Sequence, residues 1–290
     1  MQALLLPPER YHHVVPFIGL AALLFAGGTS RYAWVHGAKR VLDASEAQEL
    51  VSPETPELKR LDNVVEEMAI AAGIPKPKIW IVPDEDPNAF ATGRGPGTAH
   101  LAVTEGLLKT LDRDELQAVV AHEMSHIRNY DIRLMTLLAA MVGAIALMSN
   151  VMRRSLRGLG SRGGKGKGNP LALLILAAWV VTLLLAPIVS AILSMAVSRK
   201  REYLADATGA QLNRNPGALA RALEKIEGCA APTTHVMKGS AHMCIVDPAG
   251  ARFTSNEGRL GDLFASHPPI RLRVARLRGM SYSEAPSLSA

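Results

Sequence analysis

The chain has 290 residues, of which 48% are hydrophobic and 20% are charged, and its formal net charge is +6. A mean hydropathy of +0.13 is high for a chain with this many charges and favours a membrane protein. Much of the basic excess lies in residues 153–169 and beside apolar segments, so acidic lipid explains it better than nucleic acid. The sequence shows no nucleotide-binding fingerprint, because Gly93-Arg94-Gly95 is followed by Pro96-Gly97, which does not fit a phosphate-binding loop.

Residues 1–35 are predicted to form an N-terminal membrane anchor. Their apolar stretch, residues 14–28, has fifteen residues, below the roughly 18–20 that a helix needs to cross a bilayer. A signal-peptide core and an interfacial segment are the alternatives. The signal peptide is less favoured, because Glu9 offsets Arg10, which is the single arginine of residues 1–13.

Residues 36–133 are predicted to be the first of two soluble parts of the chain. Apolar side chains recur at helical spacing in residues 53–72, which predicts an amphipathic helix that Gly73 ends. The predicted buried face of this helix consists of Leu58, Leu61, Val64, Val65 and Met68.

A small sheet follows this helix. Residues 78–82 are predicted to form a strand, and residues 89–92 and 100–104 a hairpin. The edge of such a sheet can bind a peptide through main-chain hydrogen bonds that ignore sequence. The candidate substrate-binding residues are Asn88, Ala89, Phe90 and Ala91. An ordinary turn followed by a strand is the alternative, and the residues alone favour neither.

The strongest chemical signal is the pentapeptide His122-Glu123-Met124-Ser125-His126 (HEMSH), in an apolar stretch that is predicted to be helical. Asp112 is the predicted cap of this helix, with Glu115 at the capping-box position. Residues i and i+4 share one helical face, so both imidazoles can bind one metal ion while Glu123 takes a proton from a water there. This arrangement is typical of zinc metallopeptidases. The alternative is a surface helix that carries two histidines and a glutamate by chance.

Residues 134–198 are predicted to form a transmembrane helical hairpin. Residues 134–152 and 170–197 hold nineteen and twenty-eight positions without a charged residue, and each stretch is long enough for a span. The alternative, a pair of buried core helices, is less favoured because such helices usually keep one solvated face. The glycine-rich, basic loop of residues 153–169 is predicted to be a linker or to contact lipid headgroups.

Residues 36–133, with HEMSH, are therefore predicted to be the first part of a catalytic domain. Residues 199–280 are predicted to be its second part, followed by a tail at residues 281–290. Glu202 and Asp206 lie at i and i+4 of a predicted helix. A catalytic zinc takes three protein ligands, and Glu202 can complete a His-His-Glu set, while Asp206 can accept the second ring N–H of a ligand histidine. A solvated, charged helix face is the alternative, and the nearby HEMSH motif makes the metal site the preferred interpretation.

Four motifs occur in an order and spacing that resemble the HtpX heat-shock protease family, over residues 58–277. They are HEMSH, residues 201–206 (REYLAD), residues 88–93 (NAFATG), and residues 267–270 (HPPI) followed by Arg273. Members of this family are membrane-embedded zinc metalloproteases related to the CAAX prenyl endopeptidases. The family usually shows two apolar segments before the catalytic domain, whereas this chain shows one, so either the first span is absent or the true start lies upstream.

The resemblance implies the fold and the site. The expected fold is mainly α with a small β-sheet: a gluzincin-type zinc metalloprotease domain interrupted by the transmembrane hairpin. His122, His126 and Glu202 are the implied ligands of one Zn²⁺ per chain, and Glu123 is the implied general base. The resemblance also favours substrate binding by residues 88–91.

His267 is the second candidate catalytic residue, because it can stabilise the oxyanion of a tetrahedral intermediate. The alternative is a simple turn before a helix, with Pro269 in the first turn and Arg271, Arg273 and Arg276 solvated.

We therefore expect a membrane-bound zinc endopeptidase that acts on protein substrates, namely damaged or misfolded membrane proteins. The alternatives are a CAAX-type prenyl-protein peptidase and an inactive membrane scaffold. The resemblance implies a multi-pass protein of the cell (inner) membrane with a cytoplasmic catalytic domain. Eight basic residues lie near the predicted span ends on the catalytic side and seven on the opposite side, so the distribution of positive charge does not decide the orientation. The sequence leaves open the oligomeric state and whether Cys229 and Cys244 pair.

Overall fold

The computed structural model describes residue 28 and residues 31–138, 199–229 and 268–282. The labelled helices are α2 (Pro56–Ala72), α3 (Glu105–Thr110), α4 (Arg113–Arg128), α7 (Arg199–Asn213), α8 (Pro216–Gly228) and α11 (Ile270–Tyr282), with a short 3-10 helix at Pro96–Thr98. The strands are β1 (Gln48–Glu49), β2 (Lys78–Val82), β3 (Ala89–Thr92) and β4 (His100–Thr104). Residues 31–44 and 131–138 are also helical.

Helix α2 confirms the predicted amphipathic helix, although it begins at Pro56 rather than at residue 53. The Thr55 side chain accepts a hydrogen bond from the Leu58 backbone and fixes this start, which the apolar spacing could not locate. Gly73 ends the helix with φ 67°, a conformation that glycine adopts without a steric penalty. The predicted face packs on the core: Leu61, Val64, Val65 and Met68 are buried, and Leu58 packs against them.

The strands form one sheet in the order β1-β2-β4-β3. The predicted hairpin is confirmed, because β3 pairs antiparallel to β4, with Ala91 opposite Leu101. Strand β2 runs parallel to β4 on its other side. Strand β3 therefore lies at one edge of the sheet, as edge addition of a peptide requires.

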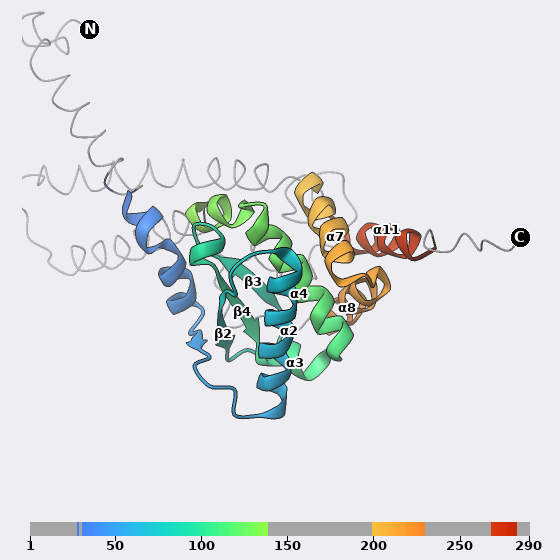
Figure 1. The fold of residues 1–290 in the computed structure, drawn as a ribbon, viewed down its shortest axis with the longest axis horizontal. Helices are drawn as coiled ribbons and strands as arrows, with labels where there is room; N and C mark the ends of the chain where they lie inside the picture. Colours follow the sequence, from blue (N-terminus) through green and yellow to red (C-terminus); the bar gives the residue numbers. More distant parts are fainter. Residues whose placement is uncertain (1–27, 29–30, 139–198, 230–267, 283–290) are drawn as a thin grey trace, which may run out of the picture.

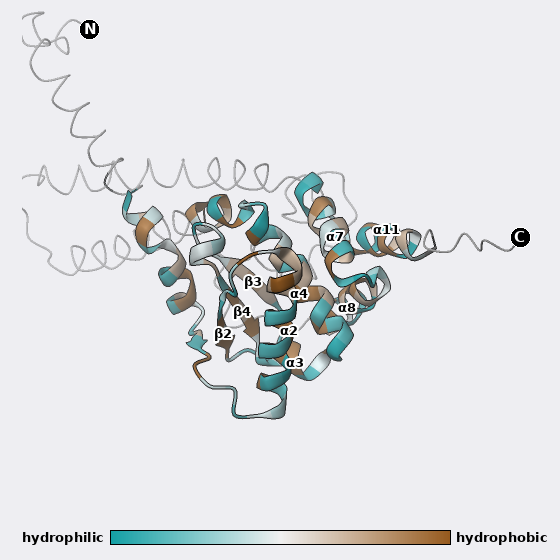
Figure 2. Ribbon diagram, in the orientation of Figure 1, coloured by the Kyte–Doolittle hydropathy of each residue, from teal (hydrophilic) through white to brown (hydrophobic). Residues whose placement is uncertain are grey.

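The alternating side chains of these strands serve two separate cores. Ile79, Ala91 and Leu101 point to the face that α2 and α4 cover. Phe90 and Ala102 point to the other face, where they pack with side chains of the helix of residues 31–44. Figures 1 and 2 show this layering, with apolar strands between the helix of residues 31–44 on one side and α2 and α4 on the other.

Helix α4 is the element around which the rest is arranged, and its predicted capping box is present. The Asp112 side chain accepts from the Glu115 backbone at 2.9 Å, and the Glu115 side chain accepts from the Asp112 backbone at 3.0 Å. The buried Glu115 carboxylate also lies 2.6 Å from Lys225 Nζ on α8. Glu115 thus joins the start of α4 to the second half of the chain.

Helix α7 packs against α4 more extensively than any other pair of described elements does. Gly209 makes this close approach possible: a Cβ atom there would lie 3.0 Å from both the backbone N and the Cα of His122. Gly209 is one turn beyond Asp206 and two turns beyond Glu202, so all three face α4. Helices α8 and α11 pack beside α7 (Figure 1).

The predicted membrane segments fall largely outside the described residues. Of the predicted anchor and hairpin, the structure describes residue 28 and the helical residues 31–35 and 134–138. The basic loop of residues 153–169 and most of the predicted tail are also outside. Within the described ranges, no helix has both the length and the apolar character that crossing a bilayer requires.

We predict that Gly209→Ala lowers the free energy of unfolding by about 1–3 kcal/mol, because the added methyl group meets the α4 backbone in a well-packed contact. Gly279→Ala on α11 is the matched control, since a Cβ there meets no atom within 4 Å. This control should be neutral or stabilising by up to about 1 kcal/mol through helix propensity. Denaturant titration of both variants measures the difference, and equal stabilities would contradict the tight contact.

Candidate metal centre

The HEMSH motif occupies the last two turns of α4 and is entirely buried, which excludes the alternative of a chance surface helix. Glu202 and Asp206 of α7 are 0% and 3% exposed, so the alternative of a solvated charged face is also wrong. Such burial of charged groups is costly unless partners compensate for it. The partners described below supply that compensation.

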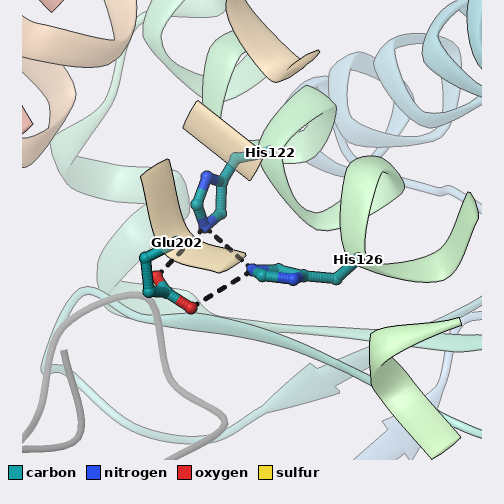
Figure 3. A group of neighbouring side chains, drawn as sticks. All are labelled: His122, His126 and Glu202. Atoms are coloured by element: carbon teal, nitrogen blue, oxygen red, sulfur yellow. Dashed lines mark hydrogen bonds and ion pairs between the residues drawn. The ribbon is translucent and has the colours of Figure 1, made fainter. Parts of the chain in front are cut away.

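Three predicted residues converge on one point. The Nε2 atoms of His122 and His126 are 3.2 Å apart. One Glu202 oxygen lies 3.8 Å from His122 Nε2 and the other lies 3.6 Å from His126 Nε2. Figure 3 shows both imidazoles, from α4, and the carboxylate, from α7, directed at the same small space.

The donor set and its spacing fit a zinc ion. Two atoms that each lie about 2.0–2.1 Å from a tetrahedral zinc are about 3.3–3.4 Å apart. The observed separations of 3.2, 3.6 and 3.8 Å are close to this value. A His-His-Glu set also leaves the fourth position open, as in catalytic zinc sites.

Asp206 lies behind His122 and not at the metal position. Its Oδ1 is 3.0 Å from His122 Nδ1, so the carboxylate can accept that N–H and leave Nε2 unprotonated for the metal. The Arg273 guanidinium binds the same carboxylate through two hydrogen bonds, of 2.9 and 2.7 Å. Burial by itself would raise the pKa of Asp206, but Arg273 and His122 outweigh it and lower the pKa to about 2.

Arg273 corrects one expectation, because the alternative interpretation of the segment after His267 had this arginine solvated. Its side chain is fully buried, and its Nη1 lies 3.8 Å from Glu202. Arg271 and Arg276 of the same helix are exposed, as that interpretation predicted. Of the four arginines of α11, Arg273 lies three residues after Ile270 and four before Leu277, which both pack in the core. Helical spacing was therefore a signal that could have identified the buried arginine, and the HtpX motif also included it.

His126 also has a carboxylate partner, which the sequence did not predict. Asp131 Oδ2 lies 3.1 Å from His126 Nδ1, and Asp131 is 8% exposed. Burial lowers the pKa of His126, but Asp131, Glu202 and Glu123 together raise it to about 9. Burial dominates at His122, whose pKa is lowered.

Glu123 is 2% exposed and lies beside the ligand cluster and strand β3. Burial raises the pKa of this carboxyl group to about 8, while His126, Arg273 and a backbone hydrogen bond with Ala91 oppose the rise. The last of these contacts places the edge strand directly next to the glutamate.

The predicted substrate segment is buried along its length. The Thr104 hydroxyl accepts from the Asn88 backbone at 2.8 Å, and Asn88 Oδ1 accepts from the Ala89 backbone at 2.9 Å. At the other end of β3, Thr136 Oγ1 accepts from the Gly93 backbone at 2.9 Å. Asn88 thus orders the start of the strand, a structural task that the sequence did not indicate. His267 lies outside the described residues, immediately before Pro268.

This helical fold with a small sheet and a buried His-His-Glu cluster is that of a metallopeptidase, and the comparisons agree. The model of peptidase family M48 matches residues 56–281, so the chain belongs to this family.

Within it, the chain is similar to the proteases named HtpX homologs, which confirms the predicted resemblance. The HtpX homolog of Caldanaerobacter subterraneus subsp. tengcongensis is 46% identical over 222 residues, covering 76% of this chain and 72% of the relative. The HtpX homolog of Dictyoglomus thermophilum is 42% identical over 270 residues, covering 93% of this chain and 84% of the relative. The crystal structure of S. mikatae Ste24p shares the fold, with a TM-score of 0.52 and 18% identity over 93% of this chain and 60% of that one.

We predict that Arg273→Met destabilises the protein by about 3–5 kcal/mol, because it leaves the buried Asp206 carboxylate without its cation. Arg273→Lys should fall between this variant and the wild type, since it keeps a charge but loses the paired hydrogen bonds. Arg276→Met on the same helix is the control; it removes an exposed arginine stacked 3.7 Å from the Tyr203 ring and should cost about 1 kcal/mol or less. Similar denaturation midpoints for the methionine variants would refute this role of Arg273.

Proposed function

We propose that the chain is a membrane-bound, zinc-dependent endopeptidase, with His122, His126 and Glu202 as the ligands of one Zn²⁺ and Glu123 as the general base. The observation that carries the proposal is the convergence of the three ligand atoms, all within 4.8 Å of one another, beside the buried carboxyl group of Glu123, which is not part of the cluster. Membership of a peptidase family supports the reaction class.

When bound, zinc supplies a Lewis acid that polarises a peptide carbonyl and lowers the pKa of water toward about 7. Glu123 takes the proton from the attacking water and returns it to the leaving amine. Its burial beside the ligand cluster suits a group that holds this proton between the two transfers. Asp206, held by Arg273, fixes the tautomer of His122.

Substrate positioning is assigned to residues 88–91. The chain of a peptide bound in an extended form would pair with the edge strand β3, whose Ala91 lies next to Glu123. His267 is proposed to stabilise the oxyanion, on the strength of its place in the HPPI motif.

The proposed substrates are damaged or misfolded membrane proteins, cleaved close to the bilayer of the cell membrane by a cytoplasmic catalytic domain. The two long uncharged stretches of the sequence and the similarity to HtpX homologs support this part of the proposal. A CAAX-type prenyl peptidase ranks lower, because three apolar segments make a poor enclosed chamber for a lipid. An inactive scaffold ranks lower because the ligand set and the base are intact.

We predict that Glu123→Gln keeps one zinc per chain, because the ligands stay and only the base is removed. The rate of casein cleavage should fall by an amount at the upper end of, or beyond, the ~10²–10⁴-fold that general-base catalysis supplies. Zinc content and cleavage are measured on full-length, detergent-purified protein. Glu202→Ala is the matched control, which should lower zinc content as well as activity. Near-normal cleavage by Glu123→Gln would remove this residue from the mechanism, and full zinc in Glu202→Ala would place the third ligand elsewhere.

We further predict that the protein stays in the membrane fraction after carbonate extraction, even without residues 1–35, because each long apolar segment is hydrophobic enough to insert. Single cysteines at positions 52, 161 and 255, in a chain whose Cys229 and Cys244 are changed to serine, report the topology. Positions 52 and 255 should react from one face of the membrane and position 161 from the other. Reaction of all three from one face would disprove the spanning hairpin and leave the zinc site untouched.

A further inference from the structure

The helix that carries HEMSH is interrupted immediately after the motif. Helix α4 ends at Arg128, Tyr130 adopts a left-handed conformation with φ 62°, and a new helix begins at residue 131. In an unbroken helix, Asp131 would lie five residues and about 140° round from His126, directed away from it. The interruption instead brings Asp131 Oδ2 to 3.1 Å from His126 Nδ1.

A tyrosine with positive φ is an unusual conformation that costs on the order of 1–3 kcal/mol. Tyr130 is 47% exposed, so the burial of its ring contributes little free energy to offset this cost. Such an outlier persists where the surroundings determine it, and often where function needs it.

The surroundings of Tyr130 come from the turn between β3 and β4. The Arg133 guanidinium lies 4.1 Å from the centre of the Tyr130 ring, and Arg133 Nε donates to the Arg94 carbonyl oxygen at 2.6 Å. Gly95 gives the ring room, since a Cβ atom there would approach the ring to 3.0 Å. The break in the helix is therefore held in place by the turn that follows the edge strand.

We propose that Asp131 is a positioning residue for the metal site, and that the break at Tyr130 serves to place its carboxylate behind His126. Asp131 does for His126 what Asp206 does for His122: it accepts the Nδ1 proton and so presents Nε2 to the metal. This inference rests on the proposed zinc site and adds a residue to it.

The second oxygen of Asp131 points to the other half of the chain. Its Oδ1 lies 3.6 Å from Arg201 Nη1, on α7, next to Glu202. Because the Arg201 side chain is 39% exposed, this ion pair is weak by itself. It nevertheless makes Asp131 a contact between the ligand histidine of α4 and the residue adjoining the third ligand on α7.

The first test measures zinc affinity by chelator competition on full-length, detergent-purified variants. Asp131→Ala should weaken zinc binding by roughly 10–100-fold, and Asp131→Asn should weaken it less, because the amide oxygen still accepts the ring N–H. Asp114→Asn, which changes an exposed carboxylate of α4, is the control and should bind zinc within about twofold of the wild type. The Co²⁺-substituted forms should show altered visible absorption for Asp131→Ala and none for the control.

Wild-type zinc affinity in Asp131→Ala would overturn the inference. Glu202→Ala, measured in parallel, distinguishes a failure of the Asp131 role from a failure of the zinc site itself. If Glu202→Ala loses zinc while Asp131→Ala keeps it, the role of Asp131 fails and the metal site stands. If both keep zinc, the proposed site itself fails.

The second test addresses the break and does not alter Asp131. Tyr130→Asn and Tyr130→Val both remove the ring, but asparagine tolerates positive φ and a β-branched residue does not. Tyr130→Asn should bind zinc within a few-fold of the wild type, whereas Tyr130→Val should bind at least about tenfold more weakly. Equal affinities in the two variants would show that the left-handed turn does not place the carboxylate.

Discussion

The buried pair of Asp206 and Arg273 is the interaction on which the site depends. It joins α7 to α11, and the same carboxylate reaches His122 on α4, so one acid connects three helices from distant parts of the sequence. A carboxylate this deep would be protonated without a cation beside it. Arg273 keeps it ionised, and an ionised Asp206 is what orients the histidine.

The remaining charges of the site follow the same logic. Glu202 and Glu123 place two further carboxyl groups in a space that is almost closed to solvent, and Arg273 and His126 oppose the negative charge that these groups carry when ionised. A divalent cation between the ligand atoms would complete this balance. Burying this many ionisable groups together costs folding free energy, and such costly clusters are typical of functional sites.

The sheet gives the site its second component. Its two faces are packed by different helices, and its edge strand β3 also contacts α4. The turn after β3 also holds Tyr130 through Arg94, Gly95 and Arg133. The strand proposed to bind substrate and the break that places Asp131 are therefore parts of one local structure.

The sequence by itself determined the local elements and the chemical type of the site. The spacing of HEMSH and of Glu202 with Asp206 requires only that each segment be helical, and capping residues such as Asp112 and Glu115 mark where a helix starts. Local rules of this kind act over a few residues, so they can be read without knowing the fold.

Only the tertiary structure decided which other charged residues support the site. Arg273 lies at the helical spacing of the core residues of α11, but its pairing with Asp206 follows from the packing of α11 beside α7. Asp131 lies at the wrong helical angle from His126 until the left-handed Tyr130 turns the chain. Gly209 has a low helix propensity, yet it lies where α7 packs against the His122 backbone. These roles depend on contacts between segments far apart in the chain or on one unusual backbone angle, and neither leaves a periodic signal in the sequence.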